Sequence, residues 1–298
     1  MLQAAPPSVR ARIGAYVALT KPRIIELLLV TTVPTMVVAE RGMPSLWLVT
    51  ATVIGGTLAA GGANAVNMYV DRDIDAQMRR TRNRPLVTGV IAPRSALVFA
   101  VSIEALAFVW LWVFVNLLSA ALAVAACLFY VFVYTLWLKR TSTQNIVIGG
   151  AAGAAPVLIG WTAVTGGLDW APVVLFGVIF FWTPPHFWAL AIRYRDDYRA
   201  VEVPMLPSVT TVRQTGVQIV AYALVVVALS LLFTPVASMG WLYTGVAVVA
   251  GALFVAFSVQ VLRAGTPGAA MRLFTFSITY LTVLFVAMAA DVLVRHGL

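Results

Sequence analysis

Charged residues are scarce in this chain. They make up 10% of its 298 residues, whereas hydrophobic residues make up 61%, and the mean hydropathy is +0.95. So few charges cannot cover the surface of a water-soluble globule of this size. Cysteine is almost absent as well, because Cys127 stands alone, which excludes disulfide bonds within the chain and zinc sites built from several cysteines. The sequence therefore excludes a soluble globular fold and predicts a protein embedded in lipid.

Acidic residues are fewer than basic ones, 11 against 20, so the formal net charge is +9. In a soluble protein such an excess would suggest a nucleic-acid partner. Here the cations lie in short segments between long apolar runs, which is where membrane proteins retain lysine and arginine during insertion. We therefore expect the lipid bilayer as a partner of this chain and no nucleic acid.

Long apolar runs fill most of the remaining sequence. Because a helix needs roughly 20 apolar residues to cross a bilayer, these runs predict an all-α membrane protein with nine transmembrane helices. The expected crossings lie near residues 24–39, 46–66, 95–115, 118–138, 144–164, 171–192, 216–236, 240–262 and 273–294. The tight break at 116–119 predicts a helical hairpin. We expect residues 1–298 to form a single polytopic membrane domain, with residues 1–23 as a cytoplasmic N-terminal tail.

The basic residues orient these crossings. With the N-terminus in the cytoplasm, all of the 20 lysines and arginines except Arg41 and Arg295 fall on the cytoplasmic side. A wrong number of crossings would mix the two sides. Together with an N-terminal segment that has no signal-peptide pattern, this bias predicts a multi-pass protein of the bacterial inner (plasma) membrane whose functional site faces the cytoplasm.

The acidic residues gather at two cytoplasmic positions, and the first is the end of the second crossing. Asn67, Asp71 and Asp75 are spaced so that each step turns by about 40° on a helix, and the three share one face. Asp73 points largely the other way. Two carboxylates and an amide one turn apart offer the oxygen ligands that Mg²⁺ takes when a substrate's phosphates complete its coordination. The alternative is a solvated helix end with unrelated acidic residues.

An arginine-rich loop follows this face directly. Guanidinium groups suit two-pronged contacts with phosphate oxygens, and metal and arginine together describe a diphosphate site. Membrane insertion alone also collects arginines in cytoplasmic loops, so only their position beside the acidic face favours a functional role. The loop carries Arg79, Arg80, Arg82 and Arg84.

The second acidic position lies after the sixth crossing, in Tyr194-Arg195-Asp196-Asp197-Tyr198. If Asp196 and Asp197 face the first position across a helical bundle, two Mg²⁺ ions could bridge one diphosphate and assist its departure. A solvated loop is the competing interpretation. The acids Asp169 and Asp291 lie toward the opposite membrane face, where a solvated or interfacial position suffices for them.

Several runs of residues resemble a known family. Asn67-x-x-x-Asp71-x-x-x-Asp75, followed by the arginine-rich loop, is similar to the first aspartate-rich motif of the UbiA-type intramembrane prenyltransferases, whose nine-helix plan agrees with the predicted crossings. The resemblance is closest to the haem-farnesylating branch of that superfamily and spans most of the chain. It is carried by Leu19-Thr20-Lys21-Pro22-Arg23, by the segment 139–150, and by Thr183-Pro184-Pro185-His186-Phe187-Trp188.

One frame departs from the wider superfamily. Its second motif is usually Asp-x-x-x-Asp, whereas the matching frame here is Tyr194-x-x-x-Tyr198. Asp196 and Asp197 remain as possible ligands, and Asp197 is slightly favoured. The departure leaves open which acid would bind a second metal.

The resemblance implies a reaction and the residues that serve it. Farnesyl diphosphate would lose its diphosphate with the help of Mg²⁺, the 2-vinyl group of haem b would attack the allylic cation, and water addition would give haem O. Asn67, Asp71 and Asp75 would be the catalytic metal ligands, joined by Asp196 and Asp197. The diphosphate would contact Lys21, Arg23, Arg79, Arg80, Arg82, Arg84, Lys139 and Arg140.

One histidine and several aromatic residues complete this expectation. His186 is the sole histidine inside a predicted crossing, and it follows a Pro184-Pro185 pair that is expected to break the helix. Because the implied substrate carries iron, His186 is predicted to bind or position haem, although a lone helical histidine is also typical of packing. Ring faces could shield the allylic cation, with ordinary packing as the alternative for each of Tyr69, Trp182, Phe187 and Trp188.

Three other functions compete with this one. A prenyltransferase acting on an aromatic or quinone-precursor acceptor would keep the aspartate face but need no intramembrane histidine. A haem-handling protein without catalysis would have no use for Asn67, Asp71 and Asp75. A transporter would place charged or helix-breaking residues near the midplane in both halves, whereas these acids lie at the cytoplasmic ends of crossings.

Overall fold

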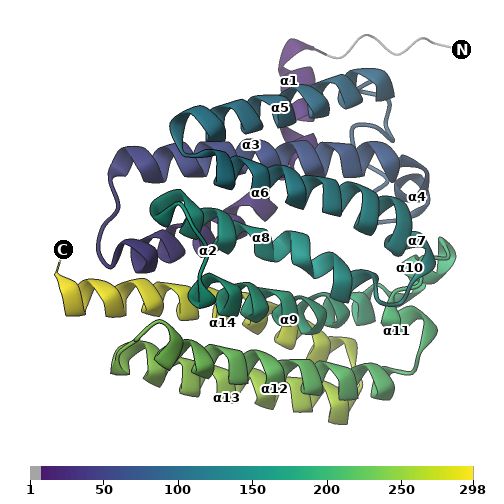
Figure 1. Cartoon of the computed structure of the whole chain (residues 1–298). Coiled ribbons are helices and arrows are strands. Elements are labelled where there is room, and N and C mark those ends of the chain that lie inside the picture. Colours follow the sequence, from purple (N-terminus) through teal and green to yellow (C-terminus); the bar gives the residue numbers. More distant parts are fainter. Residues whose placement is uncertain (1–7, 298) are drawn as a thin grey trace, which may run out of the picture.

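The computed structural model describes residues 8–297, with the backbone alone from 23 to 29. Within that range the chain forms helices and no β-strand, as lipid requires of a backbone that must satisfy its own hydrogen bonds. The all-α fold is therefore confirmed. The helices of Figure 1 are α1 (Val9–Thr20), α2 (Pro22–Glu40), α3 (Leu46–Val70), α4 (Arg72–Gln77), α5 (Pro93–Phe114), α6 (Leu117–Leu128), the π-helix η1 (Phe129–Leu138), α7 (Lys139–Thr141), α8 (Asn145–Thr165), α9 (Trp170–Arg193), α10 (Arg195–Ala200), α11 (Leu206–Val209), α12 (Val212–Val236), α13 (Trp241–Ala264) and α14 (Pro267–His296).

Eight of the described helices are long and apolar enough to cross a membrane. They are α3, α5, α8, α9, α12, α13, α14 and one continuous helix, Leu117–Thr141, which α6, η1 and α7 build together. They coincide with the second to ninth predicted crossings, so the chain is a multi-pass membrane protein. The first predicted crossing falls in α2, where the side chains of 23–29 lie outside the described residues. The ninth crossing and the cytoplasmic N-terminus stay predictions.

Side-chain caps begin the helices at the predicted breaks. Ser45 accepts a hydrogen bond from the amide of Leu48 at 3.2 Å at the start of α3. Asn116 does the same for the amide of Ser119 at 2.8 Å at the start of α6. Because only residues 115 and 116 separate α5 from α6, the predicted helical hairpin is confirmed.

The long helices run side by side, and the short helices α4, α7, α10 and α11 gather at one end of the bundle (Figure 1). The C-terminus and the 41–45 connection lie at the other end. Helix α3 packs along α5, and α8 packs against both α2 and α9. Both acidic positions of the sequence therefore lie at the same end of the molecule.

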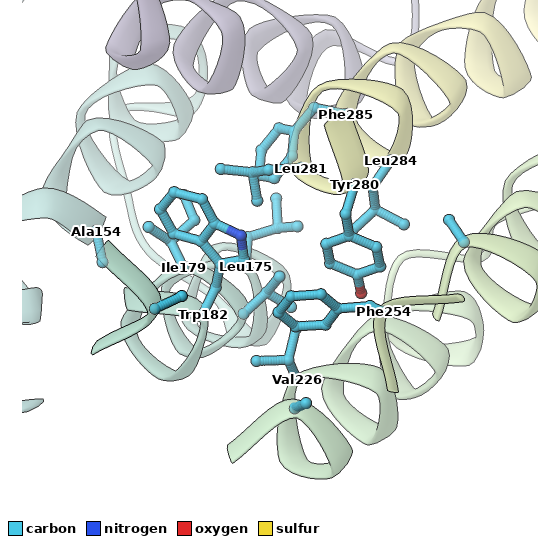
Figure 2. Packing of buried hydrophobic residues seen from close by; sticks show 14 of the residues in the cluster. Ala154, Leu175, Ile179, Trp182, Val226, Phe254, Tyr280, Leu281, Leu284 and Phe285 are labelled. Carbon is cyan, nitrogen blue, oxygen red and sulfur yellow. The ribbon is translucent and has the colours of Figure 1, made fainter. Parts of the chain in front are cut away.

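The largest buried core lies among α8, α9, α12, α13 and α14, and Figure 2 shows side chains from all five helices meeting there. Phe254 of α13 stacks on Tyr280 of α14 with ring centroids 4.8 Å apart. Trp182 of α9 donates its indole N–H to the carbonyl of Ser277 at 2.9 Å. This packing holds α9 against α14 and fixes one wall of the cavity that contains the candidate site.

Asp291 is buried, so the solvated position that the sequence suggested for it is wrong. Its side chain is 2% exposed and accepts hydrogen bonds from the amides of Gly240 at 2.6 Å and Tyr243 at 3.2 Å. A carboxylate that caps a helix start is stabilised by the free amides and by the helix dipole. Asp291 therefore ties α14 to the beginning of α13. Asp169, by contrast, is exposed, as expected.

Candidate active site

Asn67, Asp71 and Asp75 lie where α3 ends and α4 begins. The amide of Asp71 donates to the carbonyl of Asn67 at 2.9 Å, and that of Asp75 donates to the carbonyl of Asp71 at 2.8 Å. Helical register thus continues across the junction and places the three side chains on one buried face, where they are 3%, 0% and 3% exposed. Asp73 lies on the exposed side, where Arg140 donates to both carboxylate oxygens at 2.8 Å and lowers the pKa of Asp73 to about 2.

A separate cation contacts each of these three buried side chains. The pairs are Lys21 with Asn67 at 2.9 Å, Lys139 with Asp71, and Arg84 with Asp75 at 2.5 Å. The cations come from the α1–α2 junction, the first residue of α7 and the loop after α4, so only the tertiary fold brings them together. Within the described part of the chain, Oδ1 of Asp71 is buried without a hydrogen-bond partner.

Burial and the surrounding charges lower the pKa of Lys21. Burial is the main cause that lowers the pKa of Lys21 to about 7, and the nearby cations of Arg84 and Lys139 act in the same direction. The carboxylates of Asp71 and Asp75 oppose this shift. With Lys21 protonated, three cations face two carboxylates, and this surplus of positive charge suits an anionic ligand.

A cavity of about 460 Å³ among the described residues extends from this face into the bundle. Small and apolar residues of α3, α6 and α8 form much of its wall, including Gly56, Ala60, Ala126 and Gly153. Its charged and amide side chains are Lys21, Asn64, Asn67, Asp75, Arg80, Arg84 and Lys139, whereas Asp71 lies behind this wall. Such a cavity can hold a molecule that has an anionic head and a hydrocarbon tail.

Aromatic side chains also line the cavity. They are Tyr130, Tyr134, Trp182, Phe187 and Tyr198. Trp182 and Phe187 are among the aromatic residues that the sequence indicates, whereas the three tyrosines are not. The other two predicted aromatic residues do not belong to the wall. Trp188 is 0% exposed in the core, and the ring centre of Tyr69 lies 4.7 Å from the guanidinium carbon of Arg72.

Tyr130 and Tyr134 come from the π-helix η1, and their rings stack with centroids 5.2 Å apart. A helix with i→i+5 bonds turns by roughly 80° per residue, whereas an α-helix turns by about 100°. Over the nine residues from Tyr130 to Lys139, about 80° per residue gives two full turns and places both residues on the same face. An α-helix would give two and a half turns and place them on opposite faces. The apolar run 118–138 carries no sequence pattern that distinguishes these two helices, so sequence reasoning missed the tyrosines.

The structure divides the predicted diphosphate contacts into two groups. Those that line the cavity are Lys21, Arg80, Arg84 and Lys139. Arg79 and Arg82 are exposed away from the wall, and Arg140 contacts Asp73 instead. The side chain of Arg23 lies outside the described residues.

The second acidic position does not meet the first in this structure. On α10, Asp196 is exposed and Asp197 is half-buried, and neither belongs to the cavity wall. Their neighbour Tyr198 does line it, and Arg80 lies 6.0 Å from the ring centre of Tyr194. Their role as ligands of a second metal stays a prediction.

His186 is buried beside the cavity wall and not in it. Its Nδ1 lies 2.7 Å from Oγ of Ser277, and its ring stacks between Trp182 and Phe274. Because the Ser277 hydroxyl donates to the carbonyl of Phe274, Nδ1 is the donor in this bond and Nε2 keeps its lone pair. The predicted helix break is wrong, since α9 runs unbroken through Pro184 and Pro185. Haem contact by His186 stays a prediction.

The buried face has suitable donors for Mg²⁺. Asn67, Asp71 and Asp75 supply oxygen atoms, which this hard cation prefers. Oδ1 of Asp71 accepts no hydrogen bond from a described residue and lies 3.8 Å from the guanidinium of Arg140, so it has capacity for a closer contact. Among the side chains of residues 8–22 and 30–297, no group of three or more histidine, cysteine or acidic residues could hold a metal ion alone. A metal here would therefore need the amide of Asn67 and oxygen atoms of a substrate.

Comparison with known proteins identifies the family of this fold. Residues 28–287 match the UbiA prenyltransferase family, and the chain belongs to that family. It is 56% identical over 286 residues to the protoheme IX farnesyltransferase of Leifsonia xyli subsp. xyli (strain CTCB07), covering 95% of this chain and 93% of that protein. It is 57% identical over 290 residues to that of Nocardioides sp. (strain ATCC BAA-499 / JS614), covering 95% and 92%. The resemblance to the haem-farnesylating branch is confirmed, and the chain is a prenyltransferase.

Solved structures share the architecture at low sequence identity. A digeranylgeranylglyceryl phosphate synthase superposes with a TM-score of 0.78 at 17% identity, covering 94% of this chain and 98% of that one. A UbiA homologue from Archaeoglobus fulgidus bound to GPP and Mg²⁺ gives a TM-score of 0.62 at 15% identity, covering 92% and 99%. These similarities show the UbiA fold.

Proposed function

We propose that this chain transfers the farnesyl group of farnesyl diphosphate to the 2-vinyl group of haem b, with addition of water, and so forms haem O and diphosphate. The observation that carries the proposal is the cavity, which joins a charged face to small apolar walls. The sequence supports it as well, because the chain is 56% and 57% identical to two proteins named protoheme IX farnesyltransferase.

The diphosphate would bind at the charged face and the hydrocarbon along the small residues. Lys21, Arg84 and Lys139 already converge there and would donate to the phosphate oxygens. Mg²⁺ held by Asn67, Asp71 and Asp75 would neutralise negative charge on the departing group. A second ion at Asp196 or Asp197 would require these side chains to turn toward the cavity, because neither lines it.

Bond making would follow departure of the diphosphate. The allylic C–O bond breaks, the terminal carbon of the vinyl group forms a C–C bond with the farnesyl cation, and the positive charge moves to the carbon next to the porphyrin. Water adds to that carbon and releases a proton, which completes a hydroxyethylfarnesyl side chain. Tyr134 and Trp182 line the cavity, and their rings would stabilise the first cation.

The charged end of the cavity would face the cytoplasm of a bacterial inner membrane. The support is the distribution of basic residues, since all but Arg41 and Arg295 of the 20 flank crossings on that side. Farnesyl diphosphate and haem b would then enter from the cytoplasm or the adjoining leaflet. Labelling of cysteines introduced at 82 and 41 by a membrane-impermeant reagent in intact cells tests this orientation, because only position 41 should react.

The reaction is tested by incubating purified, detergent-solubilised protein with haem b, farnesyl diphosphate and Mg²⁺ and following the haem mass by liquid chromatography and mass spectrometry. The parent should form hydroxyethylfarnesyl haem, and Asp71→Asn, which keeps the shape of the side chain but removes its charge, should lose this product. Asp169→Asn is the matched control, because Asp169 is an exposed helix cap outside the cavity.

Other outcomes favour the competing functions. If a folded preparation binds both substrates and makes no farnesylated haem, the haem acceptor is wrong, and prenylation of an aromatic acid in the same assay would favour the alternative enzyme. Binding of haem without cleavage of farnesyl diphosphate would instead favour a haem-handling protein.

A further inference from the structure

Thr135, a residue of η1 that does not line the cavity, contacts Asn67, which does. Both side chains are buried, at 0% and 3% exposed. The amide nitrogen of Asn67 donates to Oγ1 of Thr135 at 3.2 Å and to Oδ2 of Asp71 at 2.8 Å. Among the described residues, Asn67 therefore links Thr135 to the candidate metal site.

The hydrogen-bond pattern determines which way the Asn67 amide points. Oγ1 of Thr135 donates its one hydrogen to the carbonyl of Tyr130 at 2.9 Å, so it can only accept from Asn67. The carboxylate of Asp71 likewise only accepts. Two acceptors thus hold the two N–H groups of the amide, and its oxygen must face the other way, where Nζ of Lys21 lies at 2.9 Å.

The π-helix places the Thr135 hydroxyl in this position. In an α-helix Thr135 would be rotated by about 140° from Tyr130, away from the face that Tyr130 presents to the cavity. With i→i+5 bonds the rotation is only about 40°, and the same change brings Lys139 to Asp71. π-Helical turns are rare in proteins, and those that occur lie frequently at functional sites.

We propose that Thr135 is a positioning residue that holds the oxygen of Asn67 toward the cavity for a divalent cation. This inference rests on the proposed Mg²⁺ and diphosphate site. Without the hydroxyl, one buried N–H of the amide loses its partner, which is costly in a low-dielectric interior. The amide can then rotate and present nitrogen, which does not bind Mg²⁺, in place of oxygen.

The test measures metal binding as well as turnover. Mn²⁺ replaces Mg²⁺, and its affinity is measured by electron paramagnetic resonance in the presence of farnesyl thiolodiphosphate, an analogue that reacts slowly. Thr135→Val should weaken Mn²⁺ binding about tenfold, the effect of losing roughly one buried hydrogen bond, and Thr135→Ser should restore it. Thr35→Val is the matched control, because Thr35 is also 0% exposed and, among the described residues, its hydroxyl bonds only the carbonyl of Thr31, at 2.7 Å.

Parent-like Mn²⁺ affinity in a folded Thr135→Val variant would overturn the inference, and so would failure of Thr135→Ser to bind more tightly than Thr135→Val. Folding is checked by size-exclusion chromatography and thermal unfolding. If valine prevents folding, Thr135→Ala takes its place with the same expected loss and the same overturning result. If the parent itself binds no Mn²⁺ with the analogue, the proposed metal site is wrong, which separates that failure from a failure of Thr135 alone.

Discussion

Lys139 and Asp71 are 68 residues apart in the chain and form an ion pair in which the ammonium donates to Oδ2 of a carboxylate that is 0% exposed. The pair depends on η1, because an α-helix over the same residues would turn Lys139 away from α3. Its neighbours Lys21 and Arg84 complete a set of cations around the same buried face. These contacts make the site dependent on three distant segments.

Replacing Lys139 tests this arrangement. Lys139→Met should raise the KM for farnesyl diphosphate about tenfold or more, because a charge-assisted hydrogen bond contributes about 1.5–3 kcal/mol, and it leaves the Asp71 carboxylate without its main counter-charge. Steady-state kinetics checks the KM. Arg213→Met removes an exposed cation outside the cavity and should behave like the parent. An unchanged KM in Lys139→Met would show that the ammonium does not contact the substrate.

Lys21 should take up a proton when the anionic substrate binds. Its pKa is lowered to about 7 without ligand, and a diphosphate beside the amine stabilises the charged form and raises that pKa. Uptake should therefore be largest between about pH 7 and 9, and should vanish below about pH 6, where Lys21 is already protonated. Calorimetry of farnesyl thiolodiphosphate binding in buffers of different ionisation enthalpy measures it.

Lys21→Met supplies the comparison for this measurement, because Mg²⁺ and the diphosphate bring proton changes of their own. The parent should take up more protons than the variant at pH 8, and the two should agree at pH 5.5. Equal proton uptake at pH 8 would mean that Lys21 does not titrate in the site.

The arginines of the loop after α4 should differ in importance. Arg84→Gln should raise the KM for farnesyl diphosphate about tenfold, because Arg84 lines the cavity and bonds Asp75 at 2.5 Å. Arg82 is exposed outside the wall, so Arg82→Gln should change the KM less than about twofold. Kinetics of the two variants at one fixed Mg²⁺ concentration checks this order. The reverse order would place the diphosphate on the outer side of the loop.

Asp291 should matter for stability and not for catalysis. Asp291→Ala removes the acceptor of two backbone amides at the start of α13, and the loss should cost about 1–3 kcal/mol. Thermal unfolding in detergent should show a lower Tm with an unchanged KM. Asp169→Ala, which removes an exposed cap bonded to Ala171 at 2.9 Å, should lower the Tm less. An equal loss in both variants would contradict the importance of burial.

Local patterns in the sequence determined the class of the molecule and part of its site. Apolar runs long enough to cross a bilayer predict the helices, because each such run must satisfy its own backbone hydrogen bonds in lipid. Helical spacing alone predicts that Asn67, Asp71 and Asp75 share a face, since the angle between neighbours on a helix depends only on their separation. The structure confirms a long apolar helix at each of the second to ninth predicted crossings, and it confirms this shared face.

The tertiary structure decided which distant residues meet that face. The partners Lys21, Arg84 and Lys139 are selected by helix packing, and the structure leaves Asp196 and Asp197 outside the cavity although their composition resembles that of the first position. Because η1 changes the helical turn within an apolar run, Tyr130 and Tyr134 line the cavity and Thr135 contacts Asn67. Such a change depends on contacts with neighbouring helices, and hydrophobic periodicity along a single run does not indicate these contacts.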